Sequence, residues 1–167
     1  MKVCESWLHT WTKPNLSIEQ IIERFTMAGL EVGSCEMSAP DFENVVVAEV
    51  IETKRHPQAD KLTVCQVNNG EGIVQIVCGA SNVREGLKVA LAKPGAKLPG
   101  GLNISEAKLR GEPSAGMLCS AVELGCAETS DGIWELPLDA QVGQDFRTYL
   151  NLNEHVITFE LTPNRGD

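Results

Sequence analysis

The sequence predicts a mainly β protein with some α structure, in which a small closed β-barrel is inserted into a discontinuous α+β domain. Three observations support this prediction. The middle of the chain carries many short runs of β-branched residues, separated by Gly/Pro turns at close and regular spacing. An amphipathic helix pattern and an alternating strand come before this region. One more alternating strand follows it without a nearby partner, so we expect the two outer strands to pair.

A helix is expected shortly after the N-terminus. Ser17 and Gln20 have the spacing of a capping box, in which two side chains bond reciprocally to backbone amides. The apolar residues that follow form one helical stripe: Ile18, Ile21, Ile22 and Phe25. Gly29 can end the helix in a left-handed conformation. Trp7 and Trp11 are expected to pack on this unit rather than to bind a ligand.

The outer strands are expected at residues 30–37 and 156–161, where apolar residues alternate with polar or small ones. We expect them to pair near Val32 and Ile157. The domains that follow from this pairing are residues 1–39 plus 151–167 for the outer α+β domain and residues 40–150 for the inserted barrel.

The barrel strands are expected at residues 45–51, 62–67, 73–78, 86–92, 102–105 and 117–119. Residues 68–72, Asn-Asn-Gly-Glu-Gly, have the chemistry of a hairpin turn. Residues 93–95, Lys-Pro-Gly, are expected to be a turn between two strands. Ser120 and Glu123 repeat the capping-box spacing, which predicts a short helix that Gly125 can end. The chain after Trp134 is acidic and is expected to be mostly loop.

Composition is that of an ordinary globular protein, with 43% hydrophobic and 22% charged residues among 167. No apolar run approaches a membrane span, and the first residues lack the apolar core of a signal peptide, so we expect a cytoplasmic protein with no membrane partner. The six cysteines form no C-x-x-C pair and have no metal-like spacing to histidine. We expect them to be free, small apolar residues, with no metal site.

The net charge of −9 argues at first against nucleic-acid binding, but the charge is unevenly distributed. Residues 53–112 carry nine basic and five acidic side chains, a net +4. The remaining residues carry five basic and 18 acidic side chains, a net −13. The basic residues of the middle segment are either a solvated surface without a role or a surface that contacts phosphate.

Catalytic motifs are missing from the sequence. It has no glycine-rich phosphate loop and no serine in a nucleophile elbow, and its three histidines fall in different expected elements. No catalytic residue is therefore expected. Residues 53–112 contain no Phe, Tyr or Trp, so base stacking on an aromatic platform is excluded there. RNA contact would use phosphate, sugar and shape, with His56 as the one available ring, and would be weak and salt-sensitive.

Two segments, residues 56–62 and 107–120, resemble those of the oligonucleotide-binding-fold (OB-fold) modules attached to several tRNA-handling proteins. The flanking segments 26–32 (Thr-Met-Ala-Gly-Leu-Glu-Val) and 161–167 (Leu-Thr-Pro-Asn-Arg-Gly-Asp) are more specific. Together they make the chain similar to the N-terminal part of the bacterial phenylalanine–tRNA ligase β subunit, including its inserted five-stranded OB-fold tRNA-binding domain.

This resemblance implies an α2β2 ligase that attaches phenylalanine to its tRNA using ATP and Mg²⁺. In that family the active site lies in the α subunit and the editing site lies further along β, so this fragment would hold no catalytic residue and no cofactor. Its partners would be tRNA and the α subunit. The resemblance assigns tRNA contact to His56, Lys61, Lys108, Arg110, Ser114 and Ser120. Met117 and Leu118 are expected to fill the barrel, and Gly116 to allow a close backbone approach or a bulge.

Two alternatives remain open. The barrel could be a scaffold or protein–protein module with little RNA affinity. It could also be a free-standing OB-fold tRNA-binding protein, which is disfavoured because the sequence stops as if cut from a longer polypeptide.

Overall fold

The computed structural model describes residues 1–12 and 14–161. Lys13 and residues 162–167, most of the C-terminal segment used for the resemblance, lie outside the described residues. None of the helices in the described residues is both long and apolar enough to cross a membrane. The chain divides into two compact units, Met1–Ala39 with Asn151–Asp167 and Pro40–Leu150.

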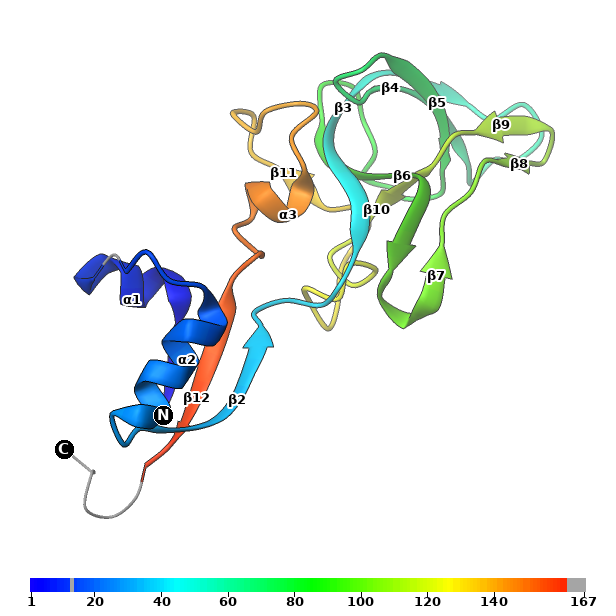
Figure 1. Ribbon diagram of the computed structural model, residues 1–167. Helices are drawn as coiled ribbons and strands as arrows, with labels where there is room; N and C mark the ends of the chain where they lie inside the picture. Colours follow the sequence, from blue (N-terminus) through cyan, green and yellow to red (C-terminus); the bar gives the residue numbers. More distant parts are fainter. Residues whose placement is uncertain (13, 162–167) are drawn as a thin grey trace. The chain divides into compact units, whose positions relative to one another are not determined.

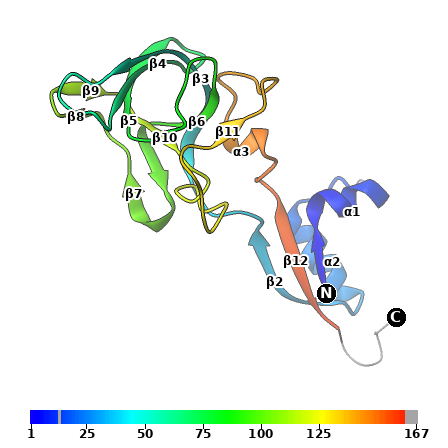
Figure 2. The same ribbon diagram turned by 180° about the vertical axis from the view of Figure 1, so that it is seen from behind.

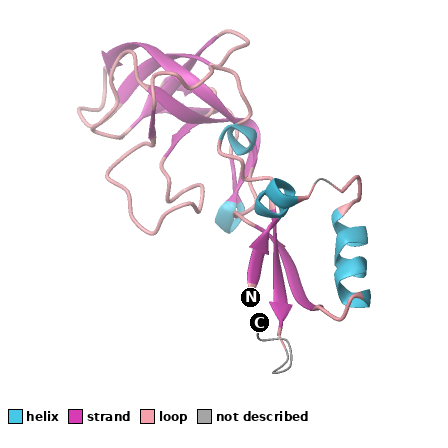
Figure 3. Cartoon of the chain, turned by 90° about the vertical axis from the view of Figure 1, so that its left-hand side faces the viewer, coloured by secondary structure: helices cyan, strands magenta, loops and turns pink. Residues whose placement is uncertain are grey.

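The first unit is built on a three-stranded antiparallel sheet in the order β1-β12-β2 (Figure 3). Its strands are β1 (Lys2–Cys4), β12 (His155–Glu160) and β2 (Glu31–Met37). Ile157 lies opposite Cys35, and Phe159 lies opposite Val32. The expected pairing of the two outer strands is confirmed.

Two helices accompany this sheet, α1 (Glu5–Trp11) and α2 (Ile18–Met27). The predicted capping box begins α2: the Gln20 amide donates to Ser17 Oγ at 3.4 Å, and the Ser17 amide donates to Gln20 Oε1 at 3.0 Å. The stripe of α2 packs on the sheet, with Ile21 buried. The Phe25 ring meets the Phe159 ring edge-on, with centroids 5.1 Å apart. The helix prediction is confirmed.

The prediction that Trp7 and Trp11 pack into the core of this unit is wrong. Their exposed fractions are 53% and 79%. Residues four apart share one face of a helix, and in α1 that face points to solvent. Leu8, on another face, makes the contact of α1 with the core.

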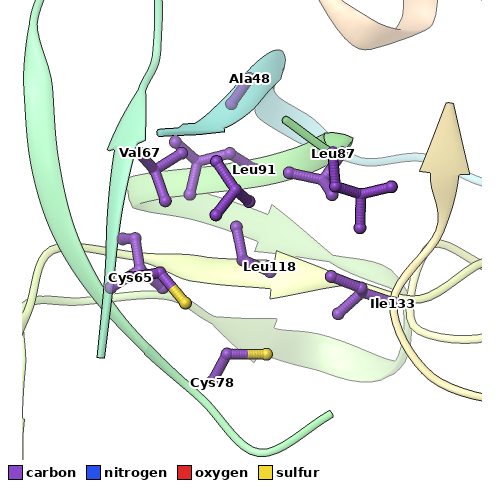
Figure 4. Packing of buried hydrophobic residues seen from close by; sticks show 11 residues of the cluster. Ala48, Cys65, Val67, Cys78, Leu87, Leu91, Leu118 and Ile133 are labelled. Atoms are coloured by element: carbon purple, nitrogen blue, oxygen red, sulfur yellow. The ribbon is translucent and has the colours of Figure 1, made fainter. Parts of the chain in front are cut away.

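The second unit is a barrel whose five principal strands follow the order β10-β6-β3-β4-β5 (Figures 1 and 2). These strands are β3 (Glu43–Arg55), β4 (Thr63–Asn68), β5 (Ile73–Cys78), β6 (Lys88–Leu98) and β10 (Met117–Cys119). Figure 4 shows Val67, Leu91 and Leu118 facing one another in the interior. Burying such β-branched and Leu side chains supplies the main stabilisation of a small barrel. The fold class, mainly β with α, is confirmed.

One expected turn is part of a strand. Strand β6 continues through Pro94 and Gly95, and the reversal comes at the 3₁₀ turn Pro99–Gly101, after which β7 (Leu102–Asn103) pairs back. Proline is tolerated here because the register of β6 on β3 shifts between Glu43 and Val45, a bulge where the ladder is interrupted.

The short helix expected after Ser120 is a series of turns. The capping bonds form, since the Ser120 amide donates to Glu123 Oε2 at 2.6 Å and the Glu123 amide donates to Ser120 Oγ at 3.3 Å. The following residues close turn bonds such as Cys126 N to Ala121 O at 2.8 Å, but no regular helix continues from them. The capping residues Ser120 and Glu123 therefore start a turn, and this turn ends at Gly125, which has a positive φ of 67°.

The acidic region after Trp134 holds more structure than expected. It contains β11 (Glu135–Leu136), which pairs with β6, and α3 (Phe146–Tyr149). Asp145 caps α3 by accepting from the Thr148 amide at 2.8 Å. Phe146 is fully buried, and its ring centroid lies 5.4 Å from that of Trp134.

Candidate nucleic-acid interface

A small hairpin projects from the barrel (Figure 1). It consists of β8 (Ala107–Leu109) and β9 (Glu112–Ser114), joined by the two residues Arg110 and Gly111. Both turn residues have positive φ, 48° and 95°, as a type I′ turn requires. Glycine adopts this conformation freely, whereas an arginine in it costs about 1 kcal/mol. The turn exposes the Arg110 side chain at its tip, and Lys108 is exposed on β8.

Strand β9 of the hairpin is anchored to the barrel by Gln75 of β5. Its Nε2 donates to Glu112 Oε2 and to the Pro113 carbonyl, both at 3.1 Å. Its Oε1 accepts from Gln66 Nε2 on β4 at 3.2 Å, and its backbone carbonyl accepts from the Ala115 amide at 2.9 Å. The side chain of Gln75 therefore connects two barrel strands to the hairpin.

Ser114 adds a second anchor at the base. Its side chain is 4% exposed, and Oγ accepts from the Val77 amide at 3.0 Å and donates to the Gly116 carbonyl at 3.0 Å. Gly116 has φ 124°, and a Cβ there would collide with the Ala92 carbonyl oxygen. The close backbone approach predicted at Gly116 is confirmed. Both hydrogen bonds of the Ser114 hydroxyl therefore go to the protein's own backbone.

His56 ties the tip of the hairpin to the loop that follows β3. The ring is 4% exposed. Nδ1 accepts from the Gln58 amide at 3.1 Å, and Nε2 lies 3.0 Å from the Leu109 carbonyl oxygen. An amide can only donate and a carbonyl can only accept, so these contacts place the ring proton on Nε2. Both ring nitrogens are used, and the ring faces are covered by protein rather than open for stacking.

The loop itself is closed by its own backbone. The His56 amide donates to the Leu62 carbonyl at 3.1 Å, and the Leu62 amide donates to the Ala59 carbonyl at 3.0 Å. Lys61 is exposed on this loop, next to the exposed Asp60. The loop and the hairpin, far apart in sequence, are thus joined through the His56–Leu109 contact.

Four exposed cations lie on the hairpin, on the loop and at the end of β3 that leads into the loop, and we call them the basic end: Arg55, Lys61, Lys108 and Arg110. No ion pair forms at any of the four among residues 1–12 and 14–161. Three other cations of the same sequence region form ion pairs. Lys54 pairs with Glu52 at 3.0 Å, Arg84 with Glu135 at 2.7 Å and Lys93 with Glu71 at 3.0 Å.

A shallow groove of about 200 Å³ adjoins the basic end. Its lining comes from β3, β4, β5, β9 and the loop after β3, and it includes Arg55, Gln66 and Gln75. The carboxylates of Glu52 and Glu112 also line it, so the groove is better suited to sugar hydroxyls than to phosphate.

Ser120 lies in a different place. Its hydroxyl donates to Glu123 Oε2 at 2.8 Å, and both residues line a separate hollow of about 410 Å³ with Leu118 and Ile133. Met117, expected to fill the barrel, is only half-buried and lines this hollow, because it alternates with the buried Leu118. A carboxylate beside Ser120 opposes the approach of a phosphate.

The structure thus brings together His56, Lys61, Lys108 and Arg110, places Ser114 beneath the hairpin and separates Ser120 from them. Arg55 and Gln75 were not predicted from the sequence as residues of the site. Arg55 directly precedes His56 in the basic segment, so its position was a usable signal. Nothing local marks Gln75, whose role depends on the hairpin 37 residues later.

The described residues contain no group of three or more His, Cys, Asp or Glu side chains that could hold a metal ion. The six cysteines are free. Burial raises the pKa of Cys65 and of Cys119 to about 12, so these thiols stay protonated in the barrel core.

Residues 45–145 match the family model described as "Putative tRNA binding domain", and this match covers more than half of the chain. The chain belongs to this family of tRNA-binding domains. Over its full length it is 56% identical to the phenylalanine–tRNA ligase β subunits of Pseudomonas fluorescens and Legionella pneumophila. It spans about a fifth, 21%, of the length of each of these relatives. Among solved structures, the C-terminal domain of Plasmodium vivax p43 is 26% identical and has a TM-score of 0.44, over 60% of this chain and 56% of that one.

Proposed function

We propose that this chain is a non-catalytic, tRNA-binding portion of a phenylalanine–tRNA ligase β subunit, and that its basic end contacts the tRNA backbone. The observation that carries the proposal is the presence of four exposed cations, none ion-paired within the described part of the chain, on the hairpin, on the loop beside it and at the end of β3. Membership in a tRNA-binding family supports RNA as the polyanion.

The expected binding mode is electrostatic. No Phe, Tyr or Trp occurs in residues 53–112, so bases have no aromatic platform there. Each cation that neutralises a phosphate releases counterions, and the affinity then falls steeply with salt. The remainder of the chain is strongly acidic, net −13, which weakens the binding of RNA further.

The proposal extends to the whole enzyme. Such a ligase attaches phenylalanine to tRNA with ATP and Mg²⁺, as an α2β2 assembly in the cytoplasm, and its chemistry takes place outside this chain. The contribution of residues 1–167 is to bind and orient the RNA.

Charge reversal tests the RNA contact. Binding of the chain to an unmodified tRNA transcript is measured by fluorescence anisotropy from low salt to physiological salt, about 0.15 M. Lys61→Glu and Arg110→Glu should each weaken binding at low salt and make it less salt-dependent. Lys97→Glu is the matched control, because Lys97 is exposed on β6 beside β7 and lies outside the basic end. Equal effects of all three substitutions, or none, would contradict the assignment.

A scaffold function is the second candidate. It is favoured by the exposure of Trp7 and Trp11 on α1, since exposed tryptophans are enriched where proteins meet. In that case charge reversal at the basic end leaves tRNA affinity unchanged. Trp11→Ser would then weaken association of this chain with the rest of a co-expressed ligase.

A further inference from the structure

Each strand of the β8–β9 hairpin is held by different bonds. On β9, Gln75 donates to Glu112 directly after the turn, and Ser114 holds the base. Among the residues that the structure describes, the bond between His56 Nε2 and the Leu109 carbonyl is the one hydrogen bond that reaches β8 from outside the hairpin. Leu109 directly precedes Arg110, so this bond lies beside the turn.

Such a hairpin needs support to keep one conformation. Each of its strands has three residues, and an isolated two-stranded hairpin is marginally stable in water. Arg110 also holds the strained left-handed conformation, with φ 48°. Gln75 ties β9 to the barrel, but without the bond from the His56 loop to β8, Lys108 and Arg110 would move independently of Lys61.

A histidine fits the anchoring position for a geometric reason. One edge of the rigid ring accepts from the Gln58 amide of its own loop, and the opposite edge reaches the hairpin, 53 residues away in sequence. The ring is 4% exposed, so it bridges the two segments without facing solvent.

We infer that His56 is a positioning residue, which fixes the hairpin tip to the loop so that Lys108, Arg110 and Lys61 present one phosphate-binding arrangement. His56 itself does not touch the RNA. The inference rests on the proposed function, because the arrangement that His56 maintains is the proposed tRNA contact surface.

Two substitutions separate the two bonds of the ring. In His56→Asn the short amide still offers an oxygen to the Gln58 amide but does not reach Leu109. In His56→Gln the longer amide can donate to the Leu109 carbonyl. We expect His56→Asn to weaken tRNA binding about threefold to tenfold at low salt, and to reduce the slope of log affinity against log salt by about 1 to 2 as two phosphate contacts loosen. His56→Gln should restore most of the affinity and of the slope.

A double-mutant cycle distinguishes positioning from direct contact. His56→Asn is combined with Lys108→Ala/Arg110→Ala, and tRNA affinity is measured for the four proteins. If His56 acts through the hairpin, its substitution changes affinity less than about twofold once the hairpin charges are gone. An undiminished effect in that background means that His56 contacts RNA directly and overturns the inference.

Amide hydrogen exchange of the free chain provides a readout without RNA. His56→Asn should accelerate exchange of the ladder amides of β8 and β9 more than that of β4 and β5, whose exchange follows only the global loss of stability. Exchange of β8 and β9 that rises no more than that of β4 and β5 overturns the positioning role, even if binding falls. If Lys108→Ala/Arg110→Ala does not affect tRNA binding, the proposed contact surface fails, and the larger acceleration in β8 and β9 still establishes His56 as the anchor of the hairpin.

Discussion

Arg84 and Glu135 form a two-bond pair in which Nη1 donates to Oε1 at 2.8 Å and Nη2 donates to Oε2 at 2.7 Å. The pair joins the connection between β5 and β6 to β11. Asn82 strengthens this connection, because its Nδ2 donates to Glu135 Oε1 at 3.1 Å and to the Ile133 carbonyl at 2.9 Å. Hydrogen bonds from Arg84 and Asn82 lower the pKa of Glu135 from 4.5 to about 2.

This pair predicts an acid-dependent contribution to stability. A carboxyl whose pKa is lowered by folding stabilises the protein fully above its unfolded pKa of 4.5, and this contribution disappears as the pH falls toward 2. Both groups are exposed, so the effect should be small. Urea unfolding of Glu135→Gln and of the parent should differ near neutral pH and converge in acid. A difference that stays constant down to about pH 2 would contradict this account.

Elements fixed by local chemistry were predictable from the sequence. The capping residues Ser17 and Gln20 and an apolar stripe predicted helix α2. A run of mainly β-branched residues after a hairpin turn predicted strand β5. The pairing of β2 with β12 followed from a physical requirement, since an alternating strand needs a neighbour. Each of these signals lies within a few residues or follows from the rule that backbone groups must be paired.

Features that depend on distant partners were not predictable. Pro94 and Gly95 signal a turn, yet they lie within β6 at an irregularity in its pairing with β3. The spacing of Trp7 and Trp11 showed that they share a face, but the position of the sheet decided which face is buried. In the candidate site, the charges of Lys61 and Arg110 could be read from the sequence. The anchoring contacts of His56 and Ser114 could not, because their partners lie dozens of residues away.

Ser114 and Ser120 should respond differently to the same substitution. Ser114→Ala removes the partner of the buried Val77 amide, which should lower the free energy of unfolding by about 1–3 kcal/mol. Ser120→Ala removes a more exposed hydroxyl, and its partner Glu123 still accepts a hydrogen bond from the backbone amide of residue 120. We expect a loss of no more than about 1 kcal/mol there. Denaturant unfolding measures both, and a larger loss for Ser120→Ala would contradict the assigned roles.

Trp11→Ser tests the exposure of the α1 face. A side chain that is 79% exposed contributes little to folding, so the free energy of unfolding should change by no more than about 0.5 kcal/mol. Phe146→Ala is the matched aromatic control, since that ring is fully buried and its truncation should cost about 3–5 kcal/mol. A loss above about 2 kcal/mol for Trp11→Ser in the same urea titration would show that the ring is packed.

Gly116→Ala should be among the most damaging small substitutions in the barrel. The new Cβ would meet the Ala92 carbonyl oxygen on β6, at a backbone φ of 124° that L-residues rarely adopt. Because β10 pairs with β6 directly after Gly116, the strand cannot move away without breaking its ladder. We expect the free energy of unfolding to fall by about 2–4 kcal/mol.

Gly86→Ala separates the clash from the backbone strain. Gly86 also has a positive φ, 75°, but no atom lies within 4 Å of a Cβ built there. Its substitution should cost only the left-handed strain, about 1–2 kcal/mol. Denaturant unfolding of the two variants then isolates the close approach of β10 to β6. Equal losses would mean that strain alone requires glycine at position 116, and that the contact with Ala92 can relax.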